Sequence, residues 1–519
     1  MAPTAGERRS DPYALPLTAA TADAAGLRHM EGPRLRGTRT RTVFVGLAAS
    51  ALFTGAPAVA AHRPVPDLAG QPRVGVEPAT PGDTLWTKRY NGPGNSDDGA
   101  TSVAVSADGA TVFVTGGGTG TTSGYDFTTL AYNAATGAAR WHKTYNGTGN
   151  GYDQATAIGV SPDGSRVFVT GASLGTGTNL DYATVAYDAS SGAQLWVRRY
   201  SGPGNRVDYA TALGVSPDGA TVFVTGYSPG SGTHDDYATL AYDASTGATV
   251  WTKRYDGPGD GNDAARALAV SPNGSTVYVT GDSTGAAGDA DYATIAYSAA
   301  IGAQVWLKRY NGPGKYVDLA EAMRVSPDGS KVFVTGESTG SGGGLDYATV
   351  AYGASNGARL WVRRYDGPVQ RDDYASAVAV SPDGATVVVT GFSVGTSYRF
   401  DYATVAYAAS SGARLWVKRY NGPANGIDDA NDVAISSNGS TVVVTGASVG
   451  SDSSVDYATV AYDASTGAQQ WVERYGGIGG NDYAYEVAIR PDGSAAYVVG
   501  ESTATNGYLD VVTLAYRLE

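Results

Sequence analysis

Short runs in which apolar and polar residues alternate make up most of residues 85–519, and four such runs recur in every unit. In the unit that begins at Asp208 they are A (209–216), B (221–226), C (236–242) and D (249–255), separated by turns rich in glycine, proline and aspartate. Alternation with a period of two predicts strands, and no run has the period of about 3.6 residues typical of a helix. Each unit is therefore expected to be an antiparallel meander of four strands.

All eight tryptophans lie in D runs, each 55 residues from the next: Trp86, Trp141, Trp196, Trp251, Trp306, Trp361, Trp416 and Trp471. A repeat of this kind is typical of propeller blades, in which tryptophans dock one blade onto the next. The first D run (85–90) precedes every A run, and the chain ends with a C run (511–516). We therefore predict an all-β fold, an eight-bladed β-propeller of four-stranded antiparallel blades at residues 85–519, its ring closed by the N-terminal strand joining the C-terminal blade.

The N-terminal residues 1–60 have a different pattern. After Met30 come four arginines within eight positions (34–41), an apolar run at 43–53 and the small-residue site Ala58-Val59-Ala60. This order is that of a secretory signal peptide, and the apolar run is short for a membrane span. We predict an extension and signal peptide at residues 1–60 with Met30 as the true start, a disordered leader at 61–84, and a secreted protein without stable membrane insertion after cleavage. An uncleaved anchor is the alternative.

The amino-acid composition limits the classes of reaction, metal site and ligand that this protein can have. The chain has no cysteine, which excludes thiolate catalysis and Cys-based metal sites. Its net charge of −13 disfavours nucleic-acid binding. Histidine is scarce, since only His62, His142 and His234 follow the signal segment, so a three-histidine metal site or a Ser-His-Asp triad has few candidates.

The turn between the C and D runs resembles the tryptophan-docking motif of quinoprotein propellers: Ala241, Asp243, Thr246, Gly247 and Trp251 stand in the spacing A-x-D-x-x-T-G-x-x-x-W. The whole unit is also similar to the bacterial SBBP propeller repeats. These resemblances imply a propeller in an exported protein and no defined activity. Quinoprotein enzymes often hold a vicinal disulfide over the cofactor, which this chain cannot form, so we expect no cofactor and in particular no PQQ.

Two rings of aspartates recur with the repeat, one before each A run and one at the start of each C run. Short carboxylates at strand starts accept backbone N–H bonds, and these are also expected to pair with arginines of the D runs. Calcium binding is the functional alternative, and its best candidates are Asp260, Asp263, Asp428 and Asp432. Their spacing matches no known calcium loop.

A second group of candidates breaks the repeat. On the face of the A run that otherwise carries small residues, two successive blades have Asp432 and Glu486, and a third has Arg324 with Glu321 nearby. Innermost strands place such side chains at the axial channel. Paired carboxylates can act as acid and base or hold a cation, and the alternative is that they face channel water or bond backbone groups.

The two ends of the ring differ in sequence. The A–B and C–D turns are nearly invariant, whereas the B–C and D–A loops vary between units. Because a site on a ring must be asymmetric, we place a ligand on the B–C/D–A face, with Tyr316, Arg371, Tyr398 and Arg399 as contacts. The sequence thus favours a binding or structural scaffold for an extracellular ligand such as a glycan or protein. A lyase or hydrolase acting on a polysaccharide or similar polymer through Asp432 and Glu486 is the alternative.

Overall fold

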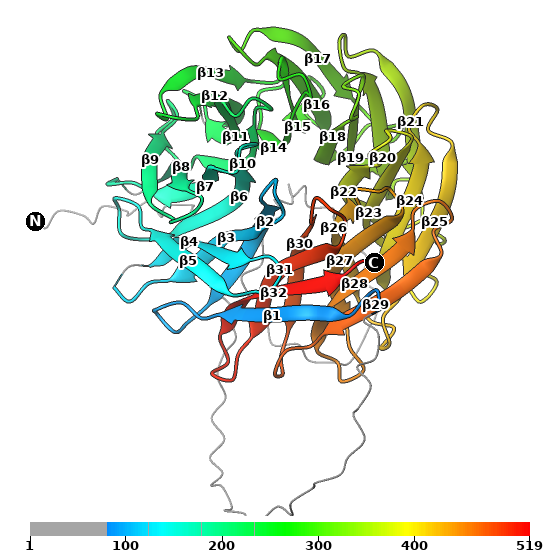
Figure 1. Ribbon diagram of the computed structural model, residues 1–519. Coiled ribbons are helices and arrows are strands. Elements are labelled where there is room, and N and C mark those ends of the chain that lie inside the picture. Colours follow the sequence, from blue (N-terminus) through cyan, green and yellow to red (C-terminus); the bar gives the residue numbers. More distant parts are fainter. Residues whose placement is uncertain (1–79, 123, 178, 233) are drawn as a thin grey trace, which may run out of the picture. The chain divides into compact units, whose positions relative to one another are not determined.

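The computed structural model describes residues 80–519 except 123, 178 and 233. In this part of the chain thirty-two strands form eight antiparallel sheets of four strands each, and no helix is present. The sheets are arranged as blades around a central axis (Figure 1). No helix suited to crossing a membrane was found among these residues. The predicted signal peptide and nearly all of the predicted leader lie outside the described residues.

Each blade runs from an innermost A strand to an outermost D strand. Blades one to four are β2 (Asp98–Val105), β3 (Thr111–Thr119), β4 (Tyr125–Asn133), β5 (Ala139–Tyr145); β6 (Asp153–Val160), β7 (Arg166–Leu174), β8 (Leu180–Asp188), β9 (Gln194–Tyr200); β10 (Tyr209–Val215), β11 (Thr221–Pro229), β12 (Asp235–Asp243), β13 (Thr249–Tyr255); and β14 (Asp263–Val270), β15 (Thr276–Thr284), β16 (Ala290–Ser298), β17 (Gln304–Tyr310). Blades five to eight are β18 (Asp318–Val325), β19 (Lys331–Thr339), β20 (Leu345–Gly353), β21 (Arg359–Tyr365); β22 (Asp373–Val380), β23 (Thr386–Val394), β24 (Phe400–Ala408), β25 (Arg414–Tyr420); β26 (Asp428–Ile435), β27 (Thr441–Val449), β28 (Val455–Asp463), β29 (Gln469–Tyr475); and β30 (Asp482–Ile489), β31 (Ala495–Thr503), β32 (Leu509–Arg517), β1 (Thr84–Tyr90).

The eighth blade is shared by the two ends of the described chain, as predicted. Strand β1 pairs antiparallel with β32, and Trp86 lies opposite Ala515. The N–H of Gly82 donates to the carbonyl of Arg517 at 2.9 Å, and Gly82 lies on the indole of Trp471 with a φ of +97°. The turn before β1 is therefore connected to the last strand of the ring and to the docking tryptophan of blade seven.

The B strands are longer than the sequence pattern indicates. In blade three the strand was expected to end at residue 226, but β11 continues to Pro229 because Ser228 and Pro229 pair with Asp236 and Asp235 of β12. The A strands also contain a bulge, located between Ala210 and Ala212 in this blade. Glycine, serine and proline are typical of loops, so their pairing with a neighbouring strand was not predictable from local pattern alone.

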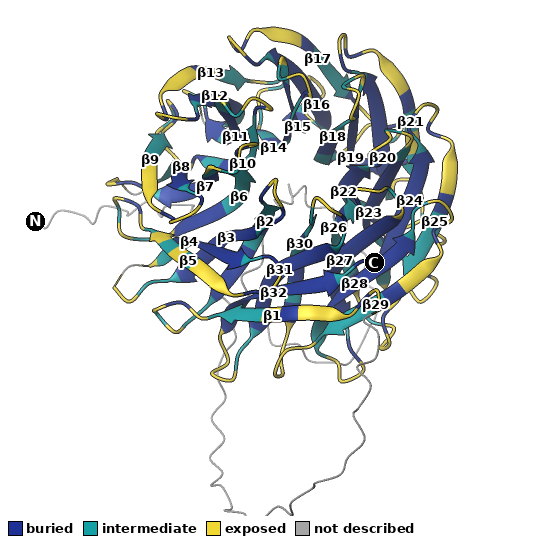
Figure 2. Ribbon diagram, in the orientation of Figure 1, coloured by how far each residue is buried: buried dark blue, intermediate teal, exposed yellow. Residues whose placement is uncertain are grey.

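The tryptophans dock adjacent blades, as predicted. Trp251 of blade three is 7% exposed, and its indole N–H donates to the carbonyl of Ala299 in blade four at 2.8 Å. Gly302 of the same turn has a positive φ and covers the indole, where a β-carbon would come within 2.7 Å of the ring. The B and C strands are buried, whereas exposed residues concentrate on the D strands and the loops (Figure 2). The core is thus a series of similar interfaces between neighbouring blades.

Candidate functional site

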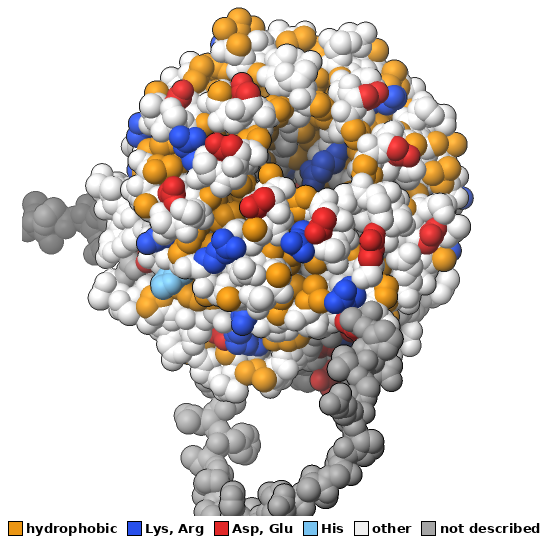
Figure 3. All heavy atoms as spheres, viewed as in Figure 1, with side chains coloured by type: hydrophobic (Ala, Val, Ile, Leu, Met, Phe, Trp, Pro, Cys, Tyr) orange, Lys and Arg blue, Asp and Glu red, His pale blue; other side chains and the backbone are white. Residues whose placement is uncertain are grey.

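The A strands line an axial channel that widens into two chambers. One chamber has a volume of about 250 Å³ and the other about 360 Å³, and Arg324, Asp432 and Glu486 line both of them. Figure 3 shows the ring hollowed at its centre, with basic side chains on the wall of the hollow. The structure therefore brings together three of the residues that the sequence placed at the channel, from blades five, seven and eight.

Each of the two channel carboxylates accepts a backbone hydrogen bond from the next blade. The N–H of Val487 donates to Oδ2 of Asp432 at 3.0 Å, and the N–H of Val103 donates to Oε2 of Glu486 at 2.7 Å. Both carboxylates thus connect blades on either side of the ring closure, and both still line the cavity.

The same two groups have perturbed acidities. Burial, and next the charge of Asp432, raise the pKa of Glu486 to about 7. Burial also raises the pKa of Asp432, while the N–H of Val487 and the charge of Arg324 act against this. Burial and mutual repulsion thus both favour the protonated form of an acid in this pair.

Glu321 lies on the same wall of the channel as Arg266, which the sequence analysis did not single out. The Nε of Arg266 forms an ion pair with Asp282 at 2.8 Å. At the corresponding position of blade three, the hydroxyl of Thr211 instead donates to the carbonyl of Ala265 in blade four at 2.9 Å. At this repeat position blades four and five thus have charged side chains at the channel, whereas blade three has a threonine that connects it to the next blade.

The two aspartate rings have the structural roles that the sequence predicted. In the first ring, Asp153 accepts the N–H groups of Gly147 at 2.8 Å and Leu174 at 2.9 Å. In the second ring, Asp181 forms an ion pair with Arg199 of the D strand at 2.8 Å. Six further Arg–Asp pairs repeat this geometry in the described chain: Arg89–Asp510, Arg254–Asp236, Arg309–Asp291, Arg364–Asp346, Arg419–Asp401 and Arg474–Asp456.

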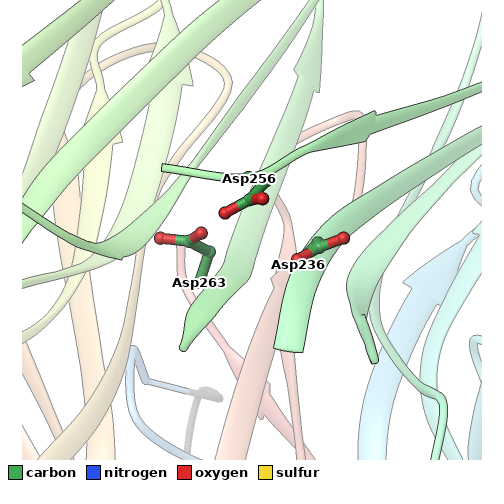
Figure 4. A group of neighbouring side chains, drawn as sticks. All are labelled: Asp236, Asp256 and Asp263. Atoms are coloured by element: carbon green, nitrogen blue, oxygen red, sulfur yellow. The ribbon is translucent and has the colours of Figure 1, made fainter. Parts of the chain in front are cut away.

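Carboxylates converge at two D–A loops. Asp236, Asp256 and Asp263 have oxygens within 4.8 Å of one another (Figure 4), and Asp346, Asp366 and Asp373 form an equivalent group. In the first group Arg254 already pairs with Asp236 at 2.7 Å, and in the second Arg364 pairs with Asp346 at 2.7 Å.

The calcium candidates from the sequence are distributed differently. Asp263 belongs to the first carboxylate group, whereas Asp260, Asp428 and Asp432 belong to neither. Asp260 is fully exposed and lies 3.2 Å from His234. Asp428 is buried and accepts the N–H of Gly422 at 2.8 Å. Only one of the four therefore lies where several carboxylate oxygens meet in the described part of the chain.

The variable loops of blades five and six hold the predicted surface residues. The guanidinium carbon of Arg371 lies 5.7 Å from the ring centroid of Tyr398. Tyr398 is 68% exposed and Tyr316 is 62% exposed, and Arg399 is exposed as well. The structure thus joins two of the four predicted contacts directly.

Backbone geometry distinguishes the same loops. Tyr398 has a φ of +61°, which is uncommon for a bulky residue. Lys315 and Gln370 have φ values of +53° and +44° in the D–A loops before blades five and six. Four of the other blades have asparagine at this position, which tolerates the conformation better: Asn95, Asn150, Asn205 and Asn425.

The model of the PQQ-like propeller family described as outer membrane protein assembly factor BamB matches residues 181–471, more than half of the chain. The chain belongs to this family. No curated protein sequence matches it.

Solved structures share its fold at low sequence identity. The Dos1 propeller is 12% identical, with a TM-score of 0.51 over 84% of this chain and 95% of that one. The C-terminal WD40 domain of Sif2 is 11% identical, with a TM-score of 0.50 over 84% and 99%. A quinohemoprotein alcohol dehydrogenase from Comamonas testosteroni is 12% identical, with a TM-score of 0.49 over 84% and 76%. At these identities the likeness concerns the propeller fold alone.

Sequence reasoning missed Arg266, Lys315, Gln370 and the loop acids Asp256 and Asp366 as parts of these sites. A signal for each was present, because each replaces the residue that its repeat position usually carries. Lys315 and Gln370 stand where asparagine recurs, and Arg266 stands where blades one to three have threonine. A position-by-position comparison of the eight units would have selected them.

Proposed function

We propose that the protein is a secreted binding scaffold whose ligand contacts the B–C/D–A face at blades five and six. The observation that carries this proposal is the exposed pair of Arg371 and Tyr398, in which the tyrosine has a left-handed backbone. Neither side chain serves the core, and strained conformations concentrate at functional positions. The family description, an assembly factor, is also a binding role rather than a catalytic one.

The chemistry of this surface favours an acidic ligand. Lys315, Arg371 and Arg399 supply three cations, and Tyr316 and Tyr398 supply exposed aromatic rings. The protein is acidic overall, so a local group of cations distinguishes this surface. These cations attract carboxylate or sulfate groups of a glycan or the acidic side chains of a protein. Exposed aromatic rings add contact area at low entropic cost.

Two double variants test the face. The substitutions Arg371→Ala and Arg399→Ala should weaken binding to an array of acidic glycans and to acidic proteins by at least about tenfold, with the melting temperature unchanged. The matched control is Arg359→Ala with Arg414→Ala, which removes two exposed arginines at the C–D ends of the same blades. If the control loses binding and the test variant retains it, the ligand lies on the other face.

A polymer-cleaving enzyme is the second candidate, and the raised pKa of Glu486 favours it. A carboxyl group with a pKa of about 7 is suited to act as a general acid at neutral pH, beside Asp432 as the base. The test is cleavage of the members of a panel of polysaccharides. If the parent protein cleaves one of them and Glu486→Gln abolishes the cleavage, the protein is an enzyme. Binding to the array without any turnover would support the scaffold.

We further infer that the channel does not hold PQQ. The chain has no cysteine to form the disulfide that quinoprotein enzymes often hold over that quinone. Of the calcium candidates from the sequence, Asp263 lies in a group of three carboxylates, and we propose calcium there. Melting temperatures in calcium and in EDTA, for the parent and for Asp256→Asn, test it.

A further inference from the structure

The axial channel carries charges of both signs. Arg324 projects from β18, Asp432 from β26 and Glu486 from β30, and all three line both chambers. The charge of Arg324 acts on both acids across the cavity. Among the residues that the structure describes, however, Arg324 forms no ion pair within 4.0 Å. The two sides of the cavity are therefore separated by a space that a small molecule can enter.

The Arg324 guanidinium has unused donor capacity. The one hydrogen bond that it makes within the described chain runs from Nη1 to the carbonyl of its own neighbour Met323, at 3.0 Å. A guanidinium carries five N–H donors, so most remain for a ligand. The other blades have alanine or glycine at this position: Ala104, Gly159, Gly214, Ala269, Ala379, Ala434 and Ala488. The arginine is thus not required to build a blade.

The acidic side of the cavity complements the arginine. Asp432 accepts the N–H of Val487 and Glu486 accepts the N–H of Val103, and the hydroxyl of Ser102 also bonds to Glu486. Both side chains still line the cavity. The cavity therefore has a cation from one blade and carboxylate oxygens from two others on its lining.

We propose that this axial site binds a small zwitterion of the α-amino acid class, with its carboxylate on Arg324 and its ammonium group between Asp432 and Glu486. A metal ion or simple amine held by the two acids would be repelled by Arg324, and a simple anion would be repelled by the acids. A molecule that carries both charges, a few ångströms apart, can pair with Arg324 and with the two acids at the same time. The chamber of about 250 Å³ lies below the size of typical drug-binding pockets, which fits a ligand of few atoms.

The test uses the whole chain and simple probes. Glycine and L-serine carry both charges, whereas acetate and methylammonium each carry one of them. Glycine and L-serine should raise the melting temperature in a saturable manner, and calorimetry should give a one-site isotherm. Acetate, methylammonium and calcium chloride should bind at least about tenfold more weakly. Equal binding of methylammonium or calcium would overturn the proposal in favour of a plain cation site, and no response to any amino acid would overturn it altogether.

Three variants locate the site. Arg324→Ala restores the common residue of the repeat, so it should fold normally and lose glycine binding by at least about tenfold. Asp432→Asn and Glu486→Gln keep an oxygen for the backbone N–H and remove the charge, so both should weaken glycine and leave the fold intact. Unchanged binding in Arg324→Ala contradicts the proposal. Arg371→Ala is the control on the outer face, and it should bind glycine normally even if it loses the macromolecular ligand.

Discussion

The carboxylate of Glu486 accepts the backbone N–H of Val103 at 2.7 Å, which connects blade eight to blade one. The bond lies on the innermost strand of blade eight, and the pairing of β1 with β32 lies at the outer edge of the same blade. A residue that is a catalytic candidate in the sequence therefore also holds blade eight to blade one.

The raised pKa of Glu486 makes stability depend on pH. Because its pKa is about 7 in the folded protein and about 4.5 when unfolded, the folded state binds more protons between these values. Stability from this group is therefore fully present below about pH 4.5 and is lost as pH rises toward about 7. Burial raises the pKa of Glu501 and of Asp98 to about 7 and acts in the same direction. Melting temperatures should fall over this range, and Glu486→Gln should reduce the slope. A parallel profile for this variant would contradict the assignment.

Loss of one docking tryptophan should destabilise the whole ring. Trp251→Ala removes a buried indole and its hydrogen bond to Ala299, and leaves a cavity between blades three and four. We expect the free energy of unfolding to fall by about 3–5 kcal/mol, measured by denaturant titration. Trp251→Phe, which keeps part of the ring, should cost less. Equal losses for the two variants would show that cavity volume is not the cause.

Ring closure depends on the N-terminal strand. Deletion of residues 85–91 exposes the edge of β32 and removes Trp86 from its position beside Ala134. Since an open edge and an unfilled interface both destabilise, the melting temperature should drop sharply and aggregation should increase. Thermal unfolding with light scattering measures both. A deletion variant that melts like the parent would show that closure contributes little.

Tyr398 should store backbone strain. Its φ of +61° suits glycine, and Gly343 has a φ of +90° at the equivalent position of blade five. Tyr398→Gly and Tyr398→Ala both remove the contact with Arg371, but only glycine relieves the backbone. The glycine variant should therefore be more stable than the alanine variant by about 1 kcal/mol in denaturant titrations. Equal stabilities would mean that the loop relaxes without cost.

The signal peptide proposed from residues 30–60 predicts where the mature chain begins. Cleavage after Ala60 should give a mature N-terminus near Ala61, and residues 1–29 should be dispensable for export. N-terminal sequencing of the protein from a secreting culture checks this. A mature chain that retains residues before Arg34 would be inconsistent with a start at Met30.

The blade architecture was predictable because each blade repeats the same local sequence pattern. Alternating apolar residues, recurring turns and a tryptophan such as Trp251 every 55 residues predict four strands and a docked interface, and repetition extends this to the ring. The closing pair of β1 and β32 followed from counting the runs at the two ends. The bulge at Ala210 and the extension of β11 to Pro229 did not follow, because they depend on pairing with a neighbouring strand.

The sequence by itself thus determined the fold, the docking role of the tryptophans and the face on which the loops vary. Only the tertiary structure decided what each charged residue contacts. It placed Asp256 beside Asp236 and Asp263, joined Glu486 to the backbone of Val103, and brought Arg324 and Asp432 to the lining of one cavity. The physical reason is distance along the chain. A pattern on one strand specifies which face a side chain occupies, but contacts across blades and across the axis join residues from different repeats, and their geometry exists only in the closed ring.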